Sequence, residues 1–216
     1  MNWNIELLEH TPNGSLSCLD VAWAQVDPRP MFFVIDATLA NAESSGLNPP
    51  RSRLLKILGS CWPSLRDFAP MDALQHLGDH LQSLNELGTQ HSLHAAAAMG
   101  RLSPDGSEWD LAECGDTKIY RWNETSTDPV WAESMPADDH RVAGLLGSTA
   151  SLIRSKRLRL AANEGFVVFT DGAYHALARH ELITPQNFNK ECLSRFDLIK
   201  TGATDDATMV IISPHS

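Results

Sequence analysis

The chain has 216 residues, of which 43% are hydrophobic and 20% are charged, and its formal net charge is −10. This length and composition predict one globular domain spanning residues 1–216 and argue against a disordered chain. The negative charge argues against nucleic-acid binding, because phosphate backbones are held by clustered lysines and arginines. The N-terminus lacks the pattern of a signal peptide and no run of about 18 apolar residues occurs. We therefore expect a cytoplasmic protein with no membrane contact.

The first part of the chain predicts a β-hairpin followed by a loop. Two apolar segments, residues 16–26 and 31–36, flank a turn with the sequence Asp-Pro-Arg-Pro. Aromatic and β-branched residues on either side of such a turn are typical of paired strands. Residues 37–50 are mostly small and polar, which predicts a loop that ends at two prolines.

The middle of the chain predicts two helices and a second hairpin. Leucines at three- and four-residue spacing favour helices over residues 51–61 and 71–87. Residues 92–102 and 109–122 then predict two strands joined by the turn Ser-Pro-Asp-Gly. Four consecutive alanines in the first of these strands indicate tight packing or contact with a helix.

The remaining segments complete a mixed architecture. Residues 123–140 are polar and irregular and are a candidate flap. Apolar patterns predict strands at residues 151–160, 165–171 and 207–213, and helices at residues 174–179 and 185–195. Because hairpins and helices are both present, the order predicts an α+β sandwich rather than an alternating parallel fold.

Cysteines and tryptophans are scattered along the sequence. No CxxC pair occurs, which predicts free thiols in a reducing compartment. The tryptophans do not cluster, so we interpret them as packing residues rather than as a platform for stacking bases. The residues are Cys18, Cys61, Cys114 and Cys192, and Trp3, Trp23, Trp62, Trp109, Trp122 and Trp131.

Three aspartates lie where a hydrophobic strand gives way to a turn. They are Asp36, Asp171 and Asp205. A carboxylate at a strand end is held by the sheet and exposed at its rim, where functional residues concentrate. Because Mg²⁺ and Mn²⁺ prefer hard oxygen ligands, the three together predict a metal site.

Five segments carry further motifs in a fixed order along the chain. They are CLDVAW, FFVIDAT, LAECGDTKIYRW, GFVVFTDGAY and TDDATMVII. In turn they are similar to an early Glu-Asp or Gln-Asp segment, an Asp-Gly strand, a Gly-Asp-Ser strand, a Ser-Asp-Gly strand and a closing Asp-Asn-x-Thr strand. This series resembles the PP2C-like (PPM family) metal-dependent serine/threonine phosphatases, especially their small bacterial members. The resemblance extends from about Leu16 to Ser213.

The resemblance implies a four-layer α-β-β-α sandwich of two antiparallel sheets flanked by helices, with two Mn²⁺ or Mg²⁺ ions at one end. In such a centre the ions hold and acidify a bridging water that attacks phosphorus. Asp36 would bridge both ions, and the carbonyl of Ala37 would be a further ligand. The first site would be completed by Asp171 and Asp205.

Two more acids are implied by the same resemblance. Asp20 would orient metal-bound water, so Asp20 and Asp36 are the candidate catalytic residues. Asp116, from the Gly-Asp-Thr segment, matches the ligand of a third, weaker ion.

The chain also departs from the family pattern. Leu19 replaces a Glu or Gln, which weakens the second metal site, whereas Ala37 replaces a Gly but retains the carbonyl. No arginine precedes Arg29, so an early phosphate-clamping arginine has no counterpart. The histidine that protonates the leaving group in many members is missing after Asp36, and losing a general acid costs about 10²–10⁴ in rate.

The sequence therefore predicts a phosphatase that hydrolyses phosphoserine or phosphothreonine in a protein substrate and opposes a serine/threonine kinase. The departures favour an alternative, a pseudophosphatase that uses the same fold as a binding or regulatory module. A third hypothesis is a metal-dependent hydrolase of small phosphate esters.

Overall fold

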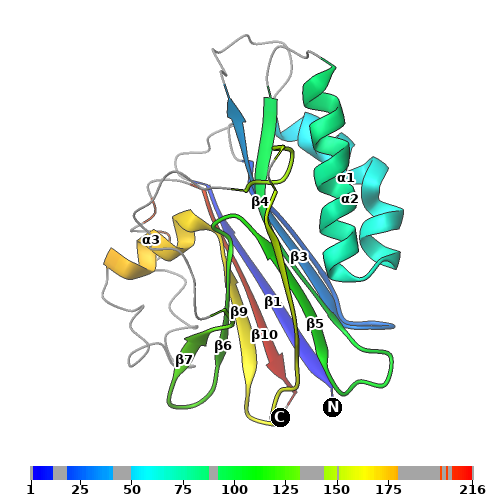
Figure 1. Cartoon of the computed structure of the whole chain (residues 1–216). Coiled ribbons are helices and arrows are strands. Elements are labelled where there is room, and N and C mark those ends of the chain that lie inside the picture. The colour runs from blue at the N-terminus through cyan, green and yellow to red at the C-terminus, as the bar shows by residue number, and fades with distance from the viewer. Residues whose placement is uncertain are drawn as a thin grey trace.

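The computed structural model describes residues 2–11, 19–40, 50–87, 92–131, 144–149, 151–179, 200, 203 and 206–215. Within these ranges, ten strands form two five-stranded antiparallel sheets, and three helices flank them (Figure 1). No helix in the described ranges is both long and apolar enough to cross a lipid bilayer.

The first sheet joins strands from the beginning and the end of the chain. Its order is β1-β10-β9-β6-β7. The strands are β1 (Trp3–His10), β6 (Lys118–Trp122), β7 (Thr127–Pro129), β9 (Gly165–Phe169) and β10 (Ala207–Pro214). Strand β9 is buried along its whole length. Because other layers cover both faces of β9, every one of its residues can be apolar.

The second sheet contains both hairpins that the sequence predicts. Its order is β2-β3-β4-β5-β8. The strands are β2 (Val21–Gln25), β3 (Met31–Ala40), β4 (Ser92–Leu102), β5 (Trp109–Cys114) and β8 (Ile153–Leu158). The edge strand β8 exposes Lys156 and Arg157, and charged side chains of this kind protect a sheet edge from pairing with other chains.

Three apolar layers separate the helices and sheets. In β3, Phe33 and Ile35 face the helices, whereas Phe32 and Val34 face the other sheet. This alternation follows from the two-residue period of a strand. The third layer lies between the first sheet and α3 (Asp171–Arg179). The molecule is thus the four-layer α-β-β-α sandwich that the resemblance implied.

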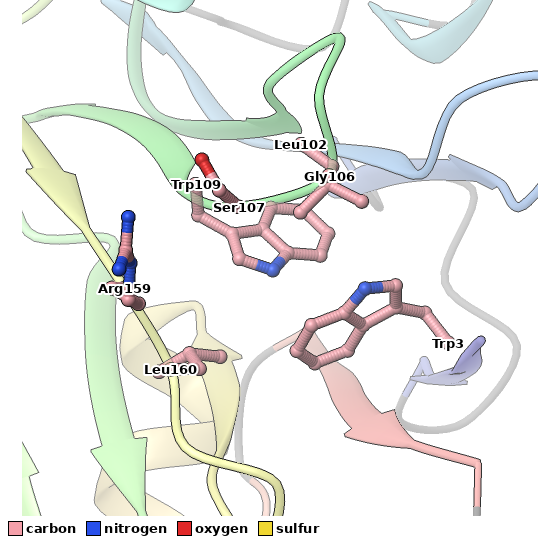
Figure 2. Close-up of a pocket in the computed structure, with 7 residues that line it drawn as sticks. All are labelled: Trp3, Leu102, Gly106, Ser107, Trp109, Arg159 and Leu160. Carbon is pink, nitrogen blue, oxygen red and sulfur yellow. The ribbon is translucent and has the colours of Figure 1, made fainter. Parts of the chain in front are cut away.

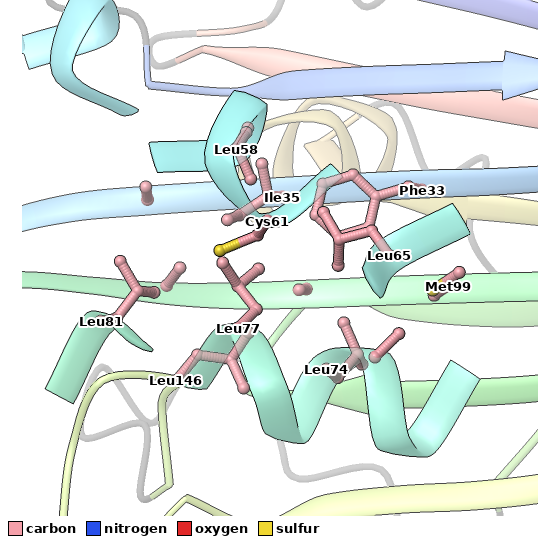
Figure 3. Packing of buried hydrophobic residues seen from close by; sticks show 14 of the residues in the cluster. Phe33, Ile35, Leu58, Cys61, Leu65, Leu74, Leu77, Leu81, Met99 and Leu146 are labelled. Atoms are coloured by element: carbon pink, nitrogen blue, oxygen red, sulfur yellow. The ribbon is translucent and has the colours of Figure 1, made fainter. Parts of the chain in front are cut away.

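Helices α1 (Pro50–Asp67) and α2 (Pro70–Glu86) cover the outer face of the second sheet (Figure 1). Figure 3 shows leucines of both helices meeting Phe33, Ile35 and Met99 of the sheet. The first helix is longer than predicted and continues through Pro63. Leu65 beyond that proline is fully buried, so packing of the next turn outweighs the hydrogen bond that proline removes.

Two sequence predictions were wrong about strand length. The predicted loop over residues 37–50 is in part strand, because β3 continues to Ala40 and pairs with Ser92; residues 41–49 lie outside the described ranges. The predicted strand over residues 109–122 is two strands in different sheets. It breaks at Gly115, whose φ of 79° is a left-handed conformation that favours glycine.

Other predictions missed pairings between distant segments. No strand was predicted at Trp3–His10, which pairs with β10, and helix α3 begins at Asp171 rather than at Tyr174. Four tryptophans also form two ring pairs, Trp3 with Trp109 and Trp23 with Trp62.

Some predictions are confirmed and others cannot be compared. Cys61 and Cys114 are free thiols, as predicted, whereas Cys18 and Cys192 lie outside the described residues. The predicted helix over residues 185–195 and residues 132–140 of the candidate flap lie outside them too.

Candidate functional site

Four of the predicted acids, Asp20, Asp36, Asp116 and Asp171, come together at one end of the sandwich. Asp36 lies opposite Ala96 of β4 in the second sheet. The turn after β5 brings Gly115 against that same alanine, since a Cβ atom at Gly115 would lie 2.7 Å from the Cβ of Ala96. Asp116 therefore follows Gly115 to the same edge. In the first sheet, Asp171 comes two residues after the last residue of β9.

Asp20 is the most buried of these acids and ties the two sheets together. Its side chain is 3% exposed. Thr170 Oγ1 donates a hydrogen bond of 2.9 Å to Asp20 Oδ2 and accepts one of 2.9 Å from the backbone N–H of Thr208. Because Thr170 directly precedes Asp171, this chain of bonds fixes Asp20 beside the end of β9.

Asp206 belongs to the same group of acids. The backbone N–H of Leu19 donates to Asp206 Oδ2 at 3.2 Å. The charge of Asp206 also raises the pKa of Asp20. The last described strand, β10, therefore begins beside the first strand of the other sheet.

The acids interact with one another electrostatically. Burial raises the pKa of Asp36 well above its ordinary value, and the charges of Asp20, Asp171 and Asp116 raise it further. Burial likewise raises the pKa of Asp20 to about 7, against a lowering by the hydrogen bond from Thr170. Like charges this close disfavour simultaneous ionisation unless a cation offsets them.

Asp116 also interacts with two basic side chains. Burial raises the pKa of Asp116, and the charge of Asp171 adds to the increase. The charges of Lys118 and His175 lower the same pKa. His175 therefore lies near enough to the acids to act on them, although it belongs to helix α3.

The chemistry of the donors fits a divalent cation. Carboxylate oxygens are the ligands that Mg²⁺ and Mn²⁺ prefer, and a cation would offset the mutual repulsion of Asp20, Asp36 and Asp171. In the part of the chain that the structure describes, no three His, Cys, Asp or Glu side chains are arranged to hold a metal ion. Asp205, one of the predicted ligands, lies outside that part.

The side chains of Leu19 and Ala37, which replace residues of the family pattern, pack away from the acids. Ala37 is buried with the residues that pack between the second sheet and its helices, and so is Leu19. Neither side chain offers an oxygen to the site. The role of the Ala37 carbonyl as a ligand stays a prediction.

Sequence reasoning missed three residues of the site. Asp206 was passed over in favour of Asp205, although the two are adjacent in the sequence. Thr170 carried a weak signal as the residue before Asp171. His175 carried none, because its approach to Asp116 depends on how α3 packs.

Two antiparallel sheets between helices, with acids gathered at one end, are the architecture of the PP2C-type serine/threonine phosphatases. Comparison with solved structures supports this fold over nearly the whole chain. The PstP/Ppp phosphatase of Mycobacterium tuberculosis superposes with a TM-score of 0.73, at 10% identity and with 100% of both chains covered. Stp1 of Staphylococcus aureus gives 0.73 at 9% identity, covering 100% of this chain and 96% of that one.

A third structure is the catalytic domain of PstP in complex with two manganese ions. It superposes with a TM-score of 0.70 at 11% identity, and 98% of each chain is covered. No family model and no curated protein matches the sequence. At these identities the likeness establishes the fold, so activity must be argued from the site.

Proposed function

We propose that the chain is a metal-dependent phosphatase that hydrolyses phosphoserine or phosphothreonine in a protein substrate. The observation that carries the proposal is the group of mutually repelling acids at one end of a PP2C-type sandwich. The pKa of Asp36 is raised by the charges of Asp20, Asp116 and Asp171. These three acids come from both sheets and from the turn between them. A purely structural role would not require so many like charges in one place.

Asp36, the carbonyl of Ala37, Asp171 and Asp205 are the residues that would hold the ions, and Asp116 would hold a weaker one. Mn²⁺ or Mg²⁺, when bound, supplies Lewis-acid polarisation of the phosphoryl oxygens and of water. Asp20 has a different task, because it is buried and held by Thr170. It positions the neighbouring ligands. Without a cation, burial raises its pKa to about 7, and a bound divalent cation would lower that pKa.

The structure also bears on the two groups that the sequence lacks. Arg29 donates to the carbonyl of Leu102 at the opposite end of the sandwich, so it does not clamp phosphate at this site. His175 is the histidine that acts electrostatically on Asp116. Within this proposal, His175 donates a proton to the departing serine or threonine oxygen, in place of the missing histidine after Asp36.

The test is release of phosphate from a phosphothreonine peptide by the whole chain, with Mn²⁺, without it, and with chelator. We expect turnover only with the metal, and a loss of at least about 100-fold in Asp171→Asn. Asp79→Asn is the matched control, because Asp79 is an exposed acid on α2 and its replacement should leave turnover unchanged. Metal-independent turnover, or full activity in Asp171→Asn, would overturn the proposal.

The pseudophosphatase alternative rests on Leu19. Its side chain packs into the core beneath the helices, and only its backbone N–H reaches an acid of the site. A second ion would therefore lack the ligand or water partner that a Glu or Gln supplies. In that case the chain would bind phosphorylated peptide without releasing phosphate at any Mn²⁺ concentration.

A further inference from the structure

A cavity of about 290 Å³ lies at the end of the sandwich opposite to the acids. Its walls come from β1, from the β4–β5 hairpin and from the segment after β8 (Figure 2). The register of β10 shows that the cavity and the acids lie at opposite ends of that strand. Trp3 in the cavity pairs with Pro214 at the end of β10, whereas Asp206 precedes the first residue of that strand.

Two indole N–H groups in this cavity are buried without an acceptor. Trp3 is 4% exposed and Trp109 is 1% exposed, and among the described residues neither Nε1 has a hydrogen-bond partner. Figure 2 shows both nitrogens on the sides of their rings that face the space between the indoles. Trp122 provides the contrast, because its Nε1 donates to the carbonyl of Phe166 at 3.0 Å.

The contact between the two rings does not satisfy these donors. The ring centroids are 5.3 Å apart and the planes are at 89°. An N–H directed at an aromatic face is a weaker interaction than a hydrogen bond to oxygen. Because an indole nitrogen can only donate, a molecule that completes the site must bring an acceptor.

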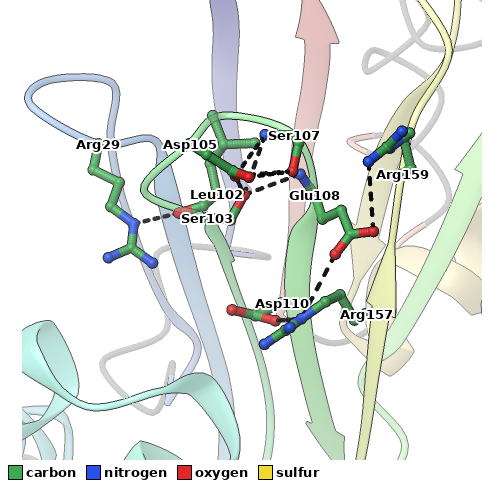
Figure 4. A network of polar contacts seen from close by, with 9 residues as sticks. All are labelled: Arg29, Leu102, Ser103, Asp105, Ser107, Glu108, Asp110, Arg157 and Arg159. Atoms are coloured by element: carbon green, nitrogen blue, oxygen red, sulfur yellow. Dashed lines mark hydrogen bonds and ion pairs between the residues drawn. The ribbon is translucent and has the colours of Figure 1, made fainter.

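The rim of the cavity carries a positive charge that is only loosely neutralised. Arg159 is 71% exposed, and its Nη2 lies 3.9 Å from Glu108 Oε1, which is too long for a hydrogen bond. The neighbouring Arg157 instead contacts Asp110 at 2.6 Å. Figure 4 shows this network, in which Arg159 is the arginine with the weaker contact.

We propose that this cavity is a binding site for a small aromatic carboxylate. The carboxylate would accept hydrogen bonds from the indole N–H groups of Trp3 and Trp109, and Arg159 would attract the anion at the rim. The aromatic ring would lie against Leu102 and Leu160 in the same walls. A volume of this size is near the lower limit of about 300 Å³ for ligand pockets, so it suits a ligand with one ring. The site is separate from the acids and does not depend on the phosphatase proposal.

Indole N–H resonances in a proton–nitrogen correlation spectrum of the whole chain test this proposal, with benzoate as the probe. Trp3→Phe and Trp109→Phe assign the two signals, and Trp122→Phe assigns the internal control. Benzoate should shift the Trp3 and Trp109 signals in a saturable way and leave Trp122 unmoved. Benzylamine, which has the same ring and the opposite charge, should not shift them.

The variants give the quantitative prediction. Trp109→Phe removes a donor to a charged acceptor, and benzoate should bind about tenfold more weakly or worse. Arg159→Met keeps the length of an exposed side chain and removes its charge, so binding should weaken by a few-fold and lose most of its salt dependence. If Trp109→Phe does not fold, Arg159→Met carries the test. The proposal is overturned if benzoate shifts neither signal, if all six indole signals move alike, or if Arg159→Met binds as the wild type does.

Discussion

The two ends of the sandwich are built from the same two sheets but bury opposite chemistry. At one end the charges of Asp20 and Asp171 raise the pKa of Asp36, and the charge of Asp171 also raises the pKa of Asp20. At the other end the indole N–H groups of Trp3 and Trp109 are buried without acceptors. One end thus has acceptors in excess and the other has donors in excess.

This difference shows that one fold can place destabilising polar groups at its ends and stabilising apolar layers between them. A buried polar group without a partner costs about 1–3 kcal/mol, and crowded carboxylates are costly for the same reason. The layers between the ends consist mainly of aliphatic and aromatic side chains that alternate along the strands, and their burial stabilises the fold. The stable middle allows each end to keep groups that are completed only by a ligand.

The largest expected effect tests whether the acidic end carries out the chemistry. In His175→Gln, hydrolysis of a phosphothreonine peptide should fall by about 10²–10⁴, because an alkoxide leaving group needs a proton. Hydrolysis of an aryl phosphate should change little, since its leaving group is already acidic. Steady-state kinetics on both substrates measure the contrast. His76→Gln is the control, because His76 is an exposed histidine on α2. Equal losses on both substrates would rule out the proton-donor role.

Glu113 shows what happens to a buried carboxylate that does have a cation beside it. Arg154 Nη2 donates to Glu113 Oε1 at 2.6 Å, yet burial raises the pKa of Glu113 from 4.5 to about 7, against the charges of Arg154 and Lys118. Because the folded-state pKa is raised, the stabilising contribution is complete below the unfolded pKa and is lost as the pH rises through the folded pKa.

Glu113→Gln removes that titration. Between about pH 4 and about pH 8, the wild type should lose on the order of 3 kcal/mol of unfolding free energy relative to the variant. Denaturant unfolding of both proteins at the two pH values measures this difference, and the shared titrations of the other acids cancel. A constant difference across the range would show that the ion pair with Arg154 dominates over burial.

A substitution that overpacks the layer between the sheets should affect the aromatic end, which contains Trp3 and Trp109, and leave the acidic end unchanged. A Cβ atom at Gly100 would lie 2.2 Å from Phe32 and 2.8 Å from Leu111, and Phe32 in turn contacts the ring of Trp109. Gly100→Ala should therefore destabilise the protein by about 1–3 kcal/mol through overpacking. It should also move the Trp109 indole signal while leaving Mn²⁺ affinity unchanged.

Gly59→Ala is the matched control for that substitution. Gly59 lies within α1 and a Cβ atom there meets no other atom within 4 Å. Alanine should stabilise the helix by up to about 1 kcal/mol, because glycine loses more backbone entropy on folding. Similar unfolding curves for the two variants would contradict the packing argument.

The smallest effect is expected at the surface of the aromatic end. Arg157 is 66% exposed and contacts Asp110 at 2.6 Å. Arg157→Ala should lower the melting temperature by no more than about 2 °C, and less at high salt, because exposed ion pairs contribute little. A larger change in thermal unfolding would mean that the network around Arg159 stabilises this end.

The local sequence was sufficient to predict elements whose apolar pattern is continuous. Strands β9 and β10 and the position of Asp171 beyond β9 could be predicted in this way. The ordered motifs that resemble the phosphatase family predicted the four layers. A strand such as β1 could not be predicted, because it is stabilised by pairing with a segment about two hundred residues away.

The contacts of the site depended on the same long-range pairing. Thr170 lies 150 residues from its hydrogen-bond partner Asp20, so no local pattern could join them. The pairing of Trp3 with Trp109 was likewise invisible in a sequence where the tryptophans are scattered. Periodicity predicts which face of an element is buried, but it does not predict which distant side chain meets it.

Calorimetric titration of Mn²⁺ into the wild type and into Asp36→Asn tests the central claim most directly. The charges of Asp20, Asp116 and Asp171 all act on Asp36, so its replacement should remove the site and also remove the repulsion that Asp36 exerts on the other three acids. We predict saturable binding to the wild type that is lost in Asp36→Asn, together with an Asp36→Asn fold at least as stable as the metal-free wild type. The absence of Mn²⁺ binding to the wild type, or equal binding to both proteins, would contradict a metal-dependent phosphatase site at this end.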